Sequence, residues 1–220
     1  MSVSKAEFKS LILVPALITL AITLLRLTGE LLNWAPALFN KAAGGGGALI
    51  GIAWLVPIFG FYFARQLLKA NHLPASAGRV LGFSVLALAV YAGLLAAAFQ
   101  FLTSNVMLFY VFGIAAAVGA LYIVRLAWPA LFNTLFTYGL AARIPVILIM
   151  FIAIMNNWGT HYDVPPPNYV ETTPFAKWVN IGLFPQLTFW LAFTVTIGAI
   201  CGGIAVAVMQ RRAFVAKAVS

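Results

Sequence analysis

Residues 80–124 read VLGFSVLALAVYAGLLAAAFQFLTSNVMLFYVFGIAAAVGALYIV. This is the longest stretch of the chain without Asp, Glu, Lys, Arg or His, 45 residues in all. A bilayer core about 30 Å thick is crossed by about 20 helical residues, so the stretch is long enough to cross twice. Its only polar cluster is Thr103-Ser104-Asn105, and such side chains favour turns because they bond to nearby backbone. We therefore predict a helical hairpin with membrane spans at about 80–102 and 105–125.

The composition of the whole chain agrees with this interpretation. Of its 220 residues, 64% are hydrophobic and 8% are charged, whereas soluble domains are about 45–50% apolar and about 25% charged. Soluble, disordered, disulfide-framework and nucleic-acid-binding proteins are thereby excluded. The net charge of +9 fits basic residues that flank membrane spans. We predict an all-α, polytopic integral membrane protein with six transmembrane helices in a single transmembrane helical domain, residues 1–220.

The other spans follow from the remaining uncharged runs, and we place them at about 9–27, 46–66, 143–160 and 185–209. The region around Arg143 has two interpretations. One long helix carries Arg143 inside the membrane, or residues 129–142 lie in the interface and the span begins at 143. Because an arginine at mid-membrane costs about 2.5–3.5 kcal/mol on insertion scales, we expect the interfacial helix. An external loop is expected at 158–180.

Basic residues are distributed unevenly between the two sides that six crossings define. Ten lie on the side of both termini and three on the other; those three are Arg26, Lys41 and Lys177. Cytoplasmic loops carry the excess of Lys and Arg. We therefore expect the protein to lie in a bacterial cytoplasmic (inner) membrane with both termini on the cytoplasmic side.

A short motif occurs twice. Residues 36–40 and 129–133 both read Pro-Ala-Leu-Phe-Asn, and each follows a tryptophan and a span that ends near an arginine. This arrangement is typical of an inverted 3+3 repeat, as in many transporters. The alternative is that Trp-Pro starts an interfacial helix twice. The polar positions related to this repeat are Arg26, Asn40, Arg125, Asn133 and Arg143.

The external loop holds the most distinctive group of side chains. It has aromatic, histidine and carboxylate residues together with three consecutive prolines at 165–167, and loops of this length are often functional. We predict an external site or partner-docking arm, or alternatively an aromatic belt around a hydrated loop. Its residues are Trp158, His161, Tyr162, Asp163 and Glu171.

The four acidic residues all lie outside the predicted spans, which argues against ion-coupled transport because coupled transporters place carboxylates at depth. The sequence predicts no catalytic residue, metal site or cofactor. We expect a non-catalytic scaffold or accessory subunit of a larger membrane complex. The expected partners are the lipid bilayer and a membrane protein or a second copy of the chain, with no nucleic acid. The alternatives are a facilitative permease or channel for a small solute and, third, a lipid-acting membrane enzyme.

Overall fold

The computed structural model describes residues 5–167 and 169–219, and in these residues it contains helices, turns and loops without β-strands. The side chains of residues 10–167 and 169–211 are described. The elements in chain order are α1 (Lys5–Leu31), η1 (Ala43–Gly45), η2 (Ile52–Trp54), α2 (Leu55–Lys69), α3 (Ala77–Phe101), α4 (Val106–Ala127), α5 (Pro129–Asn156), α6 (Pro174–Lys177), η3 (Trp178–Leu183), η4 (Gln186–Trp190) and α7 (Leu191–Val219).

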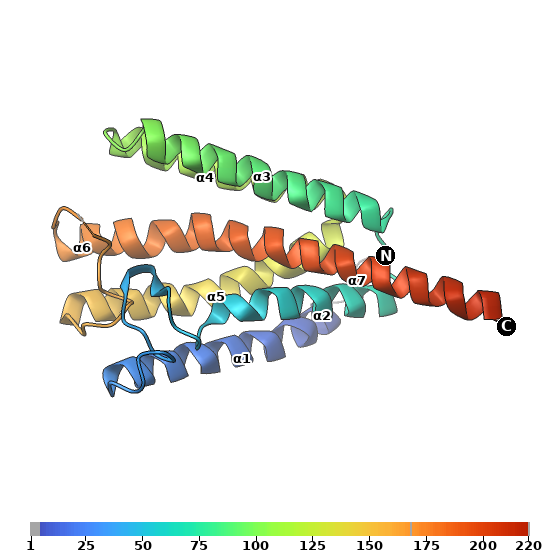
Figure 1. The fold of residues 1–220 in the computed structure, drawn as a ribbon, viewed down its shortest axis with the longest axis horizontal. Coiled ribbons are helices and arrows are strands. Elements are labelled where there is room, and N and C mark those ends of the chain that lie inside the picture. Colours follow the sequence, from blue (N-terminus) through green and yellow to red (C-terminus); the bar gives the residue numbers. More distant parts are fainter. Residues whose placement is uncertain (1–4, 168, 220) are drawn as a thin grey trace.

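The long helices run back and forth along one axis (Figure 1). Helix α7 packs against α2, α3, α5 and α4, and α1 packs against α5. Five helical segments of the described residues are long and apolar enough to cross a membrane: Ser10–Leu31, Ala77–Phe101, Val106–Ala127, Pro129–Asn156 and Pro174–Arg211. The protein is therefore an α-helical membrane protein. The start of α1 and the end of α7 lie at the same end of the bundle (Figure 1).

The predicted second span, 46–66, is helical only in its later part. Helix α2 has 15 residues, about 22 Å at 1.5 Å per residue and thus shorter than a bilayer core of about 30 Å. The preceding residues form short 3₁₀ turns, and Gly44, Gly45 and Gly47 have φ values of +71°, +73° and +76°. Glycine adopts this left-handed conformation without steric cost, so the glycine run starts a loop instead of a helix. The count of six spans stays a prediction.

The separate interfacial helix expected at 129–142 is wrong, because residues 129–156 form one continuous helix, α5. The insertion cost used in the prediction applies to an arginine that faces lipid. Arg143 is instead only 3% exposed and faces the inside of the bundle. Thr134, which lies within the same segment, is 0% exposed, and its hydroxyl donates to the Ala130 carbonyl.

Two span limits also differ from the predictions. Helix α1 continues through Glu30 to Leu31, so one carboxylate does lie within a candidate span. The last helical segment begins at Pro174 instead of 185, because the Thr173 hydroxyl accepts from the Ala176 N–H and Pro174 occupies the first helical turn. The external loop is correspondingly shorter than 158–180. The α3–α4 turn lies near 103–105, where the Asn105 side chain accepts from the Leu108 N–H and caps α4.

The two Pro-Ala-Leu-Phe-Asn segments adopt different structures. Residues 36–40 form turns between α1 and α2, whereas residues 129–133 are the first turns of α5. Trp128 is extended and Pro129 occupies the first helical position, which suits a helix start. The first copy is followed instead by glycines with positive φ. The motif therefore does not mark two equivalent structural units, and the inverted repeat is not supported by it.

The end of the bundle that contains the α2 C-terminus is filled by side chains. Tyr138 is 1% exposed, and its ring lies 5.3 Å from those of both Phe59 and Phe63, edge to face. Its hydroxyl forms a 2.8 Å hydrogen bond with Thr19 of α1. This packing joins α1, α2 and α5.

Candidate functional site

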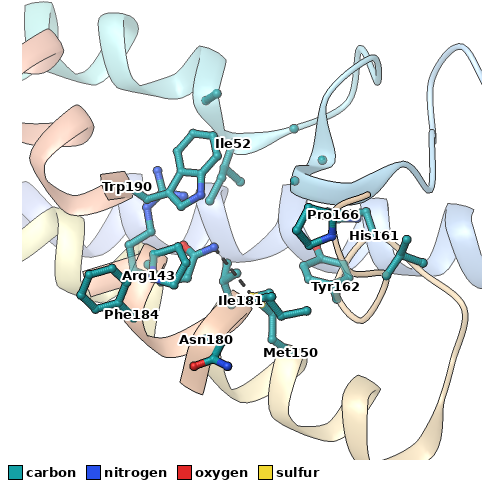
Figure 2. Close-up of a pocket in the computed structure, with 18 of the residues that line it drawn as sticks. Ile52, Arg143, Met150, His161, Tyr162, Pro166, Asn180, Ile181, Phe184 and Trp190 are labelled. Carbon is teal, nitrogen blue, oxygen red and sulfur yellow. Dashed lines mark hydrogen bonds between the residues drawn. The ribbon is translucent and has the colours of Figure 1, made fainter. Parts of the chain in front are cut away.

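A cavity of about 590 Å³ lies in the half of the bundle that carries the 32–54 and 157–173 loops. Figure 2 shows side chains around it from the 43–54 segment, α5, the 157–173 loop and the η3–η4 region. The lining residues as a whole come from α1, the 43–54 segment, α3, the α3–α4 turn, α4, α5, the 157–173 loop and the η3–η4 region. Most of the wall is apolar or aromatic, with contributions from Trp54, Phe99, Phe109, Tyr110, Phe184 and Trp190. This volume and lining are typical of small-molecule sites.

One side of the cavity is built by an irregular helical stretch. Residues 178–183 and 186–190 form π-helical turns on either side of Pro185. Proline has no N–H to donate to the preceding turn, and wider turns accommodate this break. The stretch directs Asn180, Phe184 and Gln186 toward the cavity. π-Helical turns inside helices are frequent at functional sites.

The deep end of the cavity contains Arg143. One guanidinium nitrogen, Nη2, donates to Thr194 Oγ1 at 3.2 Å, and the guanidinium carbon lies 5.0 Å from the centre of the Trp190 ring. Figure 2 shows this stacking of Arg143 against Trp190. Arg143 Nε and the nearby Gln186 Oε1 have no hydrogen-bond partner among the described residues. Both groups line the cavity, and no carboxylate side chain of the described residues lines it.

A buried cluster of three charged or titratable side chains borders the other end of the cavity, and we call it the Glu30 cluster: Arg26 and His161, which line the cavity, and Glu30, which does not. Glu30 is 0% exposed, and its Oε1 accepts from Arg26 Nε at 2.8 Å and pairs with His161 Nδ1 at 2.5 Å. Its Oε2 accepts from the His161 backbone N–H at 2.8 Å. Because a carboxylate only accepts, His161 Nδ1 carries the proton in this pair.

The glycine-rich loop completes the surroundings of Arg26. Nη2 of Arg26 donates to the carbonyl oxygens of Asn40, at 3.1 Å, and Gly45, at 3.0 Å. Gly45 has positive φ, and a Cβ atom there would lie 2.9 Å from His161 Cδ2. A side chain at this position would therefore be strained and would crowd the cluster. The Glu30 cluster thus joins α1 to both loops that border the cavity.

Asp163 has a structural role within its own turn. Its carboxylate accepts from the backbone N–H groups of Gly159 and Thr160, at 2.8 and 2.7 Å, and from the Thr160 hydroxyl at 2.7 Å. The turn holds His161 beside Glu30. It also places Tyr162 in a small apolar cluster with Val146, Met150 and Ala153, where the tyrosine hydroxyl donates to the Thr23 carbonyl at 3.2 Å.

Burial controls the titration of the loop residues. The pKa of His161 is lowered, first because burial disfavours the imidazolium and also because Arg26 is close by, although Glu30 opposes the shift. Burial likewise raises the pKa of the Tyr162 hydroxyl. His161 is therefore neutral at pH 7.

The lowered pKa of His161 predicts that acid destabilises the fold. The unfolded chain, with a histidine pKa of about 6.5, takes up the proton before the folded chain does. The contribution of neutral His161 to the free energy of unfolding is fully present above about pH 6.5. It is lost as the pH falls through the folded-state pKa, with a slope of up to about 1.4 kcal/mol per pH unit. Thermal unfolding of His161→Gln between pH 8 and 5 should be less pH-dependent than that of the wild type. Wild-type stability that rises on acidification would contradict this prediction.

The predicted external site is only partly assembled. His161 and Tyr162 border the cavity, and Trp158 packs half-buried beside Tyr162. Asp163 points into its own turn, and Glu171 is 71% exposed at 3.9 Å from Lys177 Nζ. Neither Asp163 nor Glu171 lines the cavity that His161 borders.

The polar residues related to the repeated motif do not lie together: some are at the cavity and others are exposed away from it. Arg26 and Arg143 both line the cavity, and the Asn40 carbonyl binds Arg26. Arg125 and Asn133 are exposed, and Arg125 lies over the Phe132 ring at 5.9 Å. The cavity residues therefore do not form symmetry-related pairs.

Sequence reasoning missed Glu30, Gln186 and Trp190 as site residues. The signal for Glu30 was available, since Arg26 and Glu30 are four residues apart and face each other on a helix. For Gln186 and Trp190 the sequence offers only Pro185 as a sign of irregular helix. Comparison with known proteins adds no relative: no family model matches the chain, and neither a curated protein nor a solved structure resembles it significantly.

Proposed function

We propose that the protein is a facilitative permease that binds a small solute in the cavity between α1, α4, α5 and the η3–η4 region. The observation that carries this proposal is the cavity of about 590 Å³ within a membrane-helix bundle. Tight packing around Tyr138 closes the bundle beyond it. A cavity that is closed at one end by packed side chains and bordered at the other by loops is the form expected of one state of an alternating-access carrier.

Two features support transport over static binding. The helical stretch 174–211 is interrupted beside the cavity by π-helical turns, and discontinuous helices form the binding sites of many transporters. The 43–54 and 157–173 loops cover the cavity and meet at the Glu30 cluster, so movement of these loops would change access. With both termini cytoplasmic, as the basic residues favour, the cavity faces the opposite side of a bacterial-type cytoplasmic membrane.

A cavity-filling substitution tests the proposal. Ile52 lines the cavity, whereas Leu49 in the same segment is 61% exposed and does not. In proteoliposomes, Ile52→Trp should reduce flux of naphthalene-2-carboxylate or its neutral amide by about tenfold or more, equivalent to about 1.4 kcal/mol. Leu49→Trp should leave the flux unchanged. Absence of any flux or binding that depends on the protein, or equal effects of the two substitutions, would overturn the permease proposal.

The scaffold or accessory-subunit role stays a prediction from the sequence. Purification from the native membrane in mild detergent tests it, because a stoichiometric partner would support it and a monomer that transports solute by itself would contradict it.

A further inference from the structure

The deep end of the cavity holds a cation without a counter-ion. Arg143 is 3% exposed, and it faces no carboxylate within ion-pair distance among the described residues. The described carboxylates are bound elsewhere or exposed: Glu30 in its cluster, Asp163 in its turn, and Glu171 beside Lys177. A buried charge without a partner is costly in any protein.

The hydrogen bonds of Arg143 are also incomplete. Guanidinium groups have five N–H donors, and the described residues accept one hydrogen bond, through Thr194 Oγ1 at 3.2 Å. Thr194 is itself a neutral acceptor, and its hydroxyl also donates to the Trp190 carbonyl at 2.8 Å. The Trp190 ring covers the guanidinium at 5.0 Å, which stabilises a cation but accepts no N–H bond in its plane. Arginine geometry suits two-point recognition of carboxylate or phosphate.

A second unpartnered group lines the same cavity. Gln186 is 7% exposed, its Nε2 contacts Met150 Sδ at 3.8 Å, and its Oε1 has no donor among the described residues. Its carbonyl would accept a hydroxyl or N–H group from a ligand. The rest of the cavity wall is largely apolar and aromatic, and it includes Phe109, Tyr110 and Phe184.

From these observations we infer that the solute is an organic anion, in which a carboxylate or phosphate group binds Arg143 and an apolar body lies against the aromatic wall. This inference rests on the proposed function and assigns the substrate class of the same cavity. The anionic group supplies the missing counter-ion and accepts the free N–H donors. A hydroxyl or N–H group on the ligand would donate the hydrogen bond that Gln186 Oε1 lacks.

Binding measurements on the full-length protein in phosphatidylcholine nanodiscs test the inference. The probes are naphthalene-2-carboxylate, 2-naphthyl phosphate, the neutral naphthalene-2-carboxamide, and the cationic 2-naphthyltrimethylammonium. Oleate is included to distinguish a lipid-derived anion from a water-soluble one, and sodium chloride to detect a site for inorganic anions. We expect one or both naphthyl anions, or oleate, to bind at least about tenfold more tightly than the amide and the cation. The reason is that hydrogen bonds between charged groups stabilise binding more than hydrogen bonds to neutral groups do.

Variants of Arg143 identify the site. Arg143→Met should weaken anion binding by about ten- to a hundredfold, and Arg143→Lys should retain part of it. Arg125→Met is the matched control, because Arg125 is exposed and does not line the cavity. Without ligand, Arg143→Met should unfold at the same or a higher temperature than the wild type, since an uncompensated charge is removed; a purely structural arginine would give the opposite result.

The outcomes separate the two proposals. Equal binding of the amide, cation and anions, or binding of chloride alone, would overturn the anion assignment. If Ile52→Trp still blocked flux of the neutral amide, the permease proposal would stand even though the anion assignment had failed. Failure of every probe to bind or cross would overturn both.

Discussion

Replacement of Glu30 by glutamine is expected to lower the free energy of unfolding by about 3–5 kcal/mol, the usual cost of removing one partner from a buried ion pair. The carboxylate is 0% exposed and lies between Arg26 and His161. A neutral amide leaves the Arg26 guanidinium, in a residue that is 7% exposed, without its counter-ion. Titration with a denaturing detergent, followed by circular dichroism, measures the loss.

Two comparisons make this result specific. Glu171→Gln removes a carboxylate that is 71% exposed and should change stability by no more than about 1 kcal/mol, as for other surface pairs. The double variant Arg26→Met/Glu30→Met should recover most of the loss, because apolar replacement of a whole buried pair is often neutral or stabilising. If Glu30→Gln behaved like Glu171→Gln, the Glu30 cluster would have to be hydrated and energetically unimportant.

Substitution of Gly60 by alanine is expected to destabilise the bundle by about 3 kcal/mol, the upper part of the range for overpacking. Gly60 of α2 faces Gly198 of α7, and a Cβ atom at residue 60 would lie 2.7 Å from Gly198 Cα and even closer to its carbonyl oxygen. Backbone cannot move aside as a flexible side chain can, so the two helices must separate. Small residues permit such close helix contacts in membranes.

Gly119→Ala provides the matched control. Gly119 is also a helical glycine, on α4, but a Cβ atom there would have nothing within 4 Å. Alanine should therefore be neutral or slightly stabilising, by up to about 1 kcal/mol from helix propensity. Equal effects of the two substitutions in the same detergent unfolding assay would show that α2 and α7 do not pack through Gly60 and Gly198.

These predictions assign different roles to the two halves of the molecule. Gly60 and Gly198 hold α2 against α7, near the closed end where Tyr138 packs. The Glu30 cluster instead holds together the two loops that border the other end of the cavity. Arg143 lies at the cavity and is expected to contribute nothing to stability in the absence of ligand.

Several structural features were accessible from the sequence because their causes are local. The polar residues 103–105 interrupt a long apolar run, and the helices α3 and α4 meet there. Asn105 caps α4 through its own backbone neighbours. The incorrect prediction of helix at 46–54 also has a local cause. The apolar residues suggest a membrane span, whereas the glycines at 44–47 favour left-handed turns.

The site was less predictable because it depends on residues that are distant in the sequence. His161 meets Glu30 across 131 positions, and Tyr162 meets Thr23 across 139. His161 and Tyr162 stand out in the sequence, but as part of an external arm and without their partners. The acidic residues were judged to lie outside the spans, which removed Glu30 from consideration although it lies in α1.

By itself, the sequence determined that the chain is a helical membrane protein, because the free energy of transferring each apolar residue into lipid is approximately additive and requires no knowledge of its neighbours. Only the tertiary structure decided the position of Arg143. Hydropathy assigns any arginine in a span the same cost, whereas the actual cost depends on whether lipid or protein surrounds it. Thr194 and Trp190, 51 and 47 positions away, enclose this side chain beside the cavity. Their approach depends on how α5 packs against η4 and α7, which no pattern within a single helix specifies.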